Sequence, residues 1–176
     1  MLHEDDRLLL VKHNVVACLY LHLCLCTDLS TDIFHEPNTS NDCSYDIKAL
    51  RTYSDEIYET SIRLVRDVQI LCSSDHLIMK LLMLIILFSK GADIYETHSF
   101  EPMKIYLSQN LFVNLLINYL DVRFGTCRSS IICSQLIFSI LKCQSIGRET
   151  KETLANKINQ TNELAPLMHS VLQISS

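Results

Sequence analysis

The segment Leu8–Cys26 constrains the fold most, because its apolar residues surround a helix instead of lining one side of it. A helix is expected from about Asp5 to Cys26, and almost every residue after Asn14 is apolar. A helix that is apolar all round has to be covered by other elements. This segment is therefore predicted to be the central and most buried helix of a multilayered helical domain.

Two apolar runs raise the question of a membrane span. Leu8–Cys26 is long enough, but it contains Lys12, His13, Asn14 and His22. Leu77–Phe88 has only about a dozen residues, whereas a bilayer requires about 20. Both runs are interpreted as buried helices, and no membrane contact is expected.

The composition favours a single helical domain that spans residues 1–176. The chain has 176 residues, only three Gly and three Pro, and 48% apolar residues. Few turn residues and many apolar ones are typical of helices. The net charge is −5 and no basic run occurs, so direct nucleic-acid binding is not expected, because phosphate neutralisation needs clustered Lys and Arg.

Further helices follow from apolar spacing and turn residues. Between Thr27 and Ser44 turn residues dominate, and Ile33 and Phe34 are expected to form a short extended piece. The predicted helices after this segment are Ser54–Leu71, His76–Ser89, Met103–Phe124, Cys127–Ile158 and a terminal helix over 162–173.

The eight cysteines are interpreted as free thiols in a reducing compartment. Most lie within apolar helical runs, where a thiol behaves as a small hydrophobic group. Cys24 and Cys26 are separated by one residue, which is a poor zinc spacing. His22 is interpreted as a buried histidine with a hydrogen-bond partner. No metal, cofactor or enzymatic activity is expected, since no catalytic or phosphate-binding motif occurs.

The terminal helix is amphipathic. Its apolar residues follow the i, i+3, i+4, i+7, i+8 spacing of one helix face and are Leu164, Leu167, Met168, Val171 and Leu172. A polar stretch, Gly147–Thr161, precedes it. Such a helix either completes the core or docks and undocks on a surface.

Five segments, in order and spacing, resemble the ligand-binding domains of nuclear receptors. Leu167–Leu172 resembles their activation helix, with two apolar pairs separated by two residues. Leu2–Lys12, with Asp6-Arg7 in place of Asp-Gln, resembles the latter half of the family signature. Resemblance to the family's eighth, ninth and tenth helices is carried by Leu77–Ser89, Gln109–Leu120 and Cys133–Leu141.

The resemblance implies an all-α, layered helical sandwich that is N-terminally incomplete. On this resemblance the chain would begin inside the signature, and the first three helices of the domain and the zinc module that binds DNA are expected to be absent. Either the gene product is truncated, or this is a divergent receptor that lacks its front part. The tenth helix is the family's usual dimerisation helix. The interface of a homodimer, or of a heterodimer with a nuclear receptor, is accordingly expected at Ile132, Gln135, Leu136, Ser139 and Cys143, with the alternative that Leu136 packs in the core.

The resemblance also implies a groove for a Leu-x-x-Leu-Leu helix of a coactivator. Its floor would be Arg7, Leu8, Val11 and Lys12. The terminal helix would close it with Leu167, Met168, Ser170, Val171 and Leu172. In the family a Glu and a Lys clamp the ends of the peptide helix. Here Ser170 stands at the Glu position, and the Lys belongs to the missing third helix.

A ligand pocket is implied at Val16, Leu19, Tyr20 and Leu23, with plain core packing as the alternative. At the position where several family members hold a ligand-anchoring Arg, this chain has Cys26. No cationic anchor for a carboxylate is therefore expected there.

Two functions remain open. The leading one is a receptor-type ligand-binding domain that regulates transcription in the nucleus, with shuttling to the cytoplasm left open, through a lipophilic ligand and a coactivator or corepressor. The alternative is a ligand-independent module that dimerises with an intact nuclear receptor. Ser170 favours the alternative, and the apolar face of the terminal helix favours the leading function.

Overall fold

Five long helices dominate the chain, as the apolar spacing predicts. The computed structural model describes residues 2–36, 44–52, 54–73, 75–89 and 101–158. Within them the helices are α1 (Glu4–Cys26), α2 (Asp55–Cys72), α3 (His76–Leu87), α4 (Pro102–Phe124) and α5 (Thr126–Ile158). The expected terminal helix lies outside the described residues.

Helix boundaries follow local capping chemistry. The Ser54 hydroxyl accepts a hydrogen bond from the Glu56 amide at 3.1 Å and caps α2. The Asp75 carboxylate does the same for α3, accepting from the Leu77 amide at 2.8 Å. Gly125, with φ of 78°, separates α4 from α5, a backbone conformation that suits glycine. The predicted helix ends are confirmed to within one or two residues.

A small antiparallel sheet follows α1 and includes the predicted extended piece. Its strands are β1 (Thr27–Asp28), β2 (Ile33–His35) and β3 (Ser44–Asp46), in the order β1-β2-β3. Phe34 is 2% exposed and stacks on Tyr45 with ring centroids 4.5 Å apart. A 3-10 turn, η1 (Ile47–Thr52), leads on to α2.

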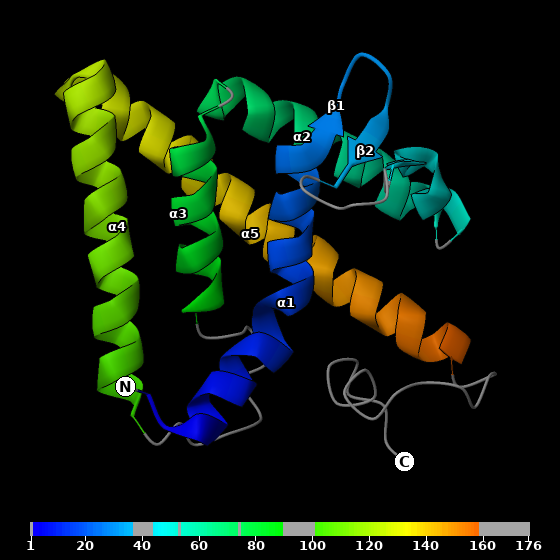
Figure 1. Cartoon of the computed structure of the whole chain (residues 1–176), viewed down its shortest axis with the longest axis horizontal. Helices are drawn as coiled ribbons and strands as arrows, with labels where there is room; N and C mark the ends of the chain where they lie inside the picture. The colour runs from blue at the N-terminus through cyan, green and yellow to red at the C-terminus, as the bar shows by residue number, and fades with distance from the viewer. Residues whose placement is uncertain (1, 37–43, 53, 74, 90–100, 159–176) are drawn as a thin grey trace.

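The crossing of α1 over α5 organises the layers (Figure 1). A Cβ on Gly147 would lie 3.1 Å from the Ala17 amide nitrogen, so a larger residue there would push the two backbones slightly apart. Nearby, the hydroxyls of Tyr20 and Thr150 are hydrogen-bonded at 2.6 Å. Figure 1 shows α4 at one edge of the molecule, with α3 between α4 and α1.

The prediction that Leu8–Cys26 forms the most buried helix is wrong. Six of the 12 residues of α3 are buried, against eight of the 23 residues of α1. Leu8, Val11 and Leu19 are exposed. The apolar residues all round α1 predict that other elements pack against every side of it. Among the described residues, α2, α3 and α5 pack against only part of its circumference.

A buried polar network joins α1, α3 and α5 at the end of α3. The Asn14 amide nitrogen donates to the carbonyls of Leu87 and Ser89 at 3.3 and 2.8 Å. The Gln144 amide nitrogen donates to the Ser89 hydroxyl at 2.7 Å. Asn14 is 2% exposed. The carbonyl of Leu87, the last residue of α3, and that of Ser89 just beyond it are thus satisfied by a side chain of α1.

By length and composition, two helical segments could cross a membrane, namely Glu4–Cys26 and Thr126–Asn156. In this structure they cross each other, and 39% of each apolar window is buried. Buried Asn14 and the Tyr20–Thr150 hydrogen bond lie within the same crossing region. These polar contacts agree with the predicted role of both as helices of a packed domain.

We predict that Asn14→Ala lowers the free energy of unfolding by about 1–3 kcal/mol, since it leaves buried carbonyls without a donor. Urea unfolding followed by circular dichroism measures the loss. Asn118→Ala, on the exposed side of α4, is the matched control and should change stability by less than about 0.5 kcal/mol. Equal midpoints for the two variants would contradict a structural role for the network.

Candidate protein-binding site

The outward face of α5 carries an apolar stripe. Its residues follow one another at alternating intervals of four and three positions. They are Cys127, Ile131, Ser134, Phe138, Leu141 and Ser145. All six are exposed, and Ile131, Phe138 and Leu141 are 62%, 68% and 55% exposed. We call this set the α5 stripe. Large apolar side chains that share one exposed helix face are typical of protein-binding surfaces.

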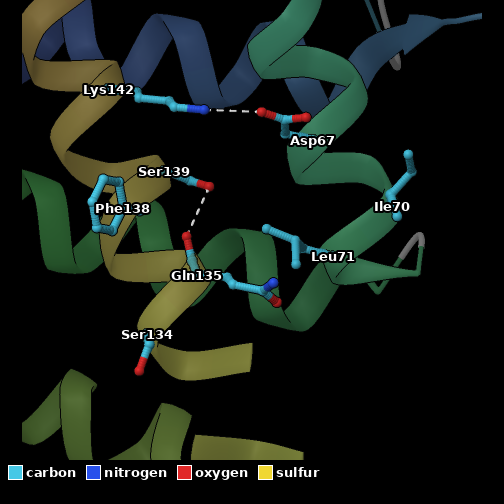
Figure 2. A pocket seen from close by; sticks show the side chains of 8 residues that line it. All are labelled: Asp67, Ile70, Leu71, Ser134, Gln135, Phe138, Ser139 and Lys142. Carbon is cyan, nitrogen blue, oxygen red and sulfur yellow. Dashed lines mark hydrogen bonds and ion pairs between the residues drawn. The ribbon is translucent and has the colours of Figure 1, made fainter. Parts of the chain in front are cut away.

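A groove runs between α2 and α5 beside this stripe. Figure 2 shows one wall formed by α2 and the other by α5. Its volume is about 460 Å³, and it is lined by Asp67, Ile70, Leu71, Ser134, Gln135, Phe138, Ser139 and Lys142. Ile70, on the α2 wall, is 74% exposed. We call this the α2–α5 groove.

One end of the groove is polar. The Lys142 ammonium nitrogen lies 3.0 Å from a carboxylate oxygen of Asp67, and both side chains are about half exposed (Figure 2). An exposed pair of this kind contributes little to stability. The Ser139 hydroxyl donates to the Gln135 carbonyl at 3.1 Å within α5. The groove thus combines apolar walls with a charged edge.

Both helices present these residues because their opposite sides form the core. On α2, Val65, Val68 and Cys72 are fully buried. On α5, Leu136 and Cys143 are fully buried. Ile70 and Phe138 lie on the opposite sides of these helices and therefore face solvent.

The residues predicted for the dimer interface require a correction. Ile132, Leu136, Ser139 and Cys143 are buried in the core, and only Gln135 is exposed. The prediction named residues on the side of α5 that packs inward. The middle of α5 is apolar on both sides, so periodicity alone did not distinguish the inner face from the outer one.

The four predicted coactivator-groove residues on α1 lie on its outer side. Arg7, Leu8 and Val11 are exposed, and Lys12 is half-buried. The Lys151 ammonium group of α5 donates to the carbonyls of Lys12 and His13 at 2.8 and 3.1 Å. The residues predicted to close the groove from the terminal helix lie outside the described residues. They are Leu167, Met168, Ser170, Val171 and Leu172.

The four predicted pocket residues do not share one environment. Val16 and Tyr20 are buried, Leu23 is half-buried and Leu19 is 56% exposed. Leu19 therefore does not face the described core, contrary to the prediction that all four point inward. The reason is that its side of α1 has no packed neighbour among the described residues.

Several exposed apolar residues of α4 were missed by the sequence analysis. They are Met103, Tyr106, Leu107, Leu111, Leu115, Ile117 and Val122. Asparagines at 110, 114 and 118 are exposed between them. Because polar and apolar residues are mixed on the exposed side of α4, the sequence shows no separate polar face that would identify this side as the outward one.

The described cysteines are free, as predicted, and Cys43 lies outside the described residues. Burial raises the pKa of Cys18 to about 11 and the pKa values of Cys72 and Cys143 to about 12. Burial also raises the pKa of Cys24, with Cys143 and Cys72 adding to the shift. These thiols stay protonated at neutral pH, so they act as packing groups and not as nucleophiles.

His22 has the hydrogen-bond partner that was predicted, but it is half-buried rather than buried. Its Nε2 lies 3.1 Å from both carboxylate oxygens of Glu36, beside Cys26. Among the described residues no group of three His, Cys, Asp or Glu side chains could hold a metal ion. The contact ties the end of β2 to α1.

Comparison with solved structures identifies the fold. The ultraspiracle ligand-binding domain from Drosophila melanogaster matches with a TM-score of 0.71 and 17% sequence identity, over 96% of this chain and 67% of that one. No protein-family profile matches the sequence, and no curated protein does. At this identity the similarity shows the fold. It confirms the all-α fold of nuclear-receptor ligand-binding domains that the sequence resemblance implied.

We predict that Cys127 reacts with a thiol reagent at pH 8 in the folded protein, whereas Cys24, Cys72 and Cys143 react only after unfolding. Cys127 is exposed. A rise in pKa from 9.0 to about 12 lowers the thiolate fraction of Cys72 and Cys143 by about a thousandfold at that pH. Mass spectrometry of alkylated peptides, with and without urea, locates the labels. Rapid labelling of Cys143 without urea would contradict the packing.

Proposed function

We propose that this chain is a regulatory module of the nuclear-receptor ligand-binding type that acts by binding another protein, with the α5 stripe and the α2–α5 groove as its contact surface. The observation that carries the proposal is the exposure of Ile131, Phe138 and Leu141 on one helix face of this fold. The partner we infer is a nuclear-receptor ligand-binding domain, which would be bound in the nucleus and without catalysis.

The chemistry of this surface supports a protein partner. Binding energy at protein interfaces is concentrated in a few large, well-buried residues, often aromatic, surrounded by contacts that exclude water. Phe138 supplies the aromatic residue, with Ile131 and Leu141 beside it on the stripe. The Asp67–Lys142 pair lies at the edge of the groove, as is usual for interface rims.

The packing of the predicted pocket supports the ligand-independent form of this function. Val16 and Tyr20 are 8% and 5% exposed and belong to the core cluster. The Tyr20 hydroxyl is already hydrogen-bonded to Thr150. Both residues thus contact neighbouring side chains of the core.

We predict that Ile131→Glu weakens binding to a partner ligand-binding domain by at least about 30-fold, because a carboxylate would be desolvated at the contact. Surface plasmon resonance with an immobilised receptor domain measures affinity, and thermal unfolding checks integrity. Val122→Glu, at a position 90% exposed on α4, is the matched control. Unchanged affinity of Ile131→Glu would reject this surface as the contact.

A second candidate function is ligand-controlled binding of a coactivator or corepressor peptide on α1. The observation that favours it is the exposure of Leu8 and Val11, one turn apart, beside Arg7 and Lys12. An apolar strip of this kind suits the apolar face of a peptide helix. A lipophilic ligand would then act by biasing the surface that receives the peptide.

We expect Val11→Glu to weaken binding of a Leu-x-x-Leu-Leu peptide at least tenfold if this second function operates, because the charge would oppose the apolar peptide face. Fluorescence polarisation of a labelled peptide measures affinity, with Val122→Glu as the control. Equal peptide affinity for both variants would remove the α1 site and leave the α5 surface as the working contact.

A further inference from the structure

We propose that Cys26 is a covalent modification site for lipophilic electrophiles of the α,β-unsaturated carbonyl class, with His22 as the base and Glu36 as the residue that positions it. The site joins the end of α1 to β2, which Figure 1 shows next to each other. It shares no residue with the α5 stripe or the α2–α5 groove. It therefore adds to the proposed function without depending on it.

A thiol, an imidazole and a carboxylate meet at this point. The Cys26 sulfur lies 3.8 Å from both ring nitrogens of His22. The Nε2 atom of the same ring lies 3.1 Å from both carboxylate oxygens of Glu36. All three residues are half-buried, so a small molecule can reach them. A nucleophile beside a base that is oriented by a third group is the arrangement that activates thiols and hydroxyls in proteins.

The contact with Glu36 determines which nitrogen of a neutral His22 accepts a proton. An ionised carboxylate only accepts hydrogen bonds, so Nε2 carries the hydrogen and donates it to Glu36. Nδ1 is then the nitrogen that accepts the thiol proton. Phe34 packs edge-on against the same ring, with centroids 5.7 Å apart, and restricts its rotation. Glu36 is therefore a positioning residue that fixes the tautomer and stabilises the imidazolium ion that forms.

The Cys26 thiol depends on this base. Burial and, to a smaller extent, the charge of Glu36 raise the pKa of Cys26, so little thiolate is present at neutral pH. Attack on an electrophile therefore requires that the thiol proton passes to His22 while the new bond forms. An unsaturated carbonyl suits this site better than an alkyl halide, because the addition takes back the proton that His22 has received.

The reaction is an addition without an oxidant or a leaving group. The thiol proton moves to Nδ1 of His22, the sulfur forms a bond to the β-carbon, and the π electrons of the C=C bond move to give an enolate. His22 then transfers the proton to the α-carbon and is neutral again. The overall change is the addition of the Cys26 S–H bond across the C=C bond.

The surface beside the thiol suits a hydrocarbon chain. Leu23 and Leu19 lie about one and two turns before Cys26 on the same side of α1. Leu19 is 56% exposed and Leu23 is half-buried. A hydrocarbon chain attached to the carbonyl group would lie along these side chains and remove apolar surface from water. The site is therefore expected to prefer electrophiles with such a chain.

Alkylation kinetics of the whole folded chain test the site. Pentyl vinyl ketone is the probe, and mass spectrometry of the peptides gives the rate at each cysteine. Cys133 is the matched control, because it is half-buried like Cys26 and its pKa is likewise raised by burial and by a carboxylate, that of Asp121. Among the described residues it has no hydrogen bond to a histidine. Cys26 is expected to react at least about tenfold faster, and equal rates would overturn the proposal.

Replacement of His22 tests the base. His22→Gln should lower the Cys26 rate at least about tenfold and leave the Cys133 rate unchanged, which also shows that the chain is folded. Imidazole added to the His22→Ala chain should restore part of the Cys26 rate, as a merely structural histidine would not. An unchanged Cys26 rate in His22→Gln, or no rescue by imidazole, would overturn the proposal.

Glu36→Gln separates positioning from simple electrostatics. It removes a charge that raises the pKa of Cys26, so a purely electrostatic role predicts a faster reaction. The positioning role predicts a reaction slower by about threefold or more. A faster reaction would contradict the assignment of Glu36.

A second probe tests the preference for a hydrocarbon chain. Methyl vinyl ketone has the same reactive group without the chain, and each rate is divided by that of glutathione. Leu19→Gln should slow the reaction of Cys26 with pentyl vinyl ketone only, because Leu19 contacts the chain of the probe. Equal relative rates of the two ketones at Cys26 would reject the lipophilic preference.

Discussion

The fold depends on satisfying helix ends that are buried among other helices. α3 is almost wholly apolar, so it belongs inside, but its last carbonyls must then find donors away from water. Asn14 from α1 donates to the carbonyl of Leu87, the last residue of α3, and to that of Ser89 just beyond it. The end of α1 is treated in the same way, because the Gln69 amide of α2 donates to the carbonyls of Cys24 and Thr27 at 2.8 and 2.7 Å. Two amide side chains therefore hold three helices in register.

The positions of the helices could be predicted from the sequence because their signals are local. Ser54 and Asp75 cap helices with their own side chains, and Gly125 ends α4 through its backbone conformation. The close α1–α5 crossing could not be predicted in this way. It depends on Gly147 meeting Ala17, two residues separated by most of the chain, and no local pattern identifies such a pair. The fold class itself came from the resemblance of several segments to one family.

The candidate site was harder to predict than the fold because an apolar helix can face inward on either side. The sequence indicated α5 as a binding helix, yet Leu136 and Cys143 are fully buried while Phe138 and Leu141 are exposed. The packing of α1, α2 and α4 against α5 decides between these faces. The groove beside Ile70 lies where α2 meets α5. The same ambiguity applies to α1. Leu19 was predicted to line a pocket, but it is exposed.

Hydrogen–deuterium exchange tests the central claim, that the outer face of α5 is the contact surface of this module. The chain is measured alone and with a receptor ligand-binding domain in excess. Our account predicts that the added domain protects peptides covering residues 131–142 of α5 and 67–71 of α2 and leaves the α3 peptides unchanged. Protection confined to residues 7–12 of α1, or none in any condition, would contradict it.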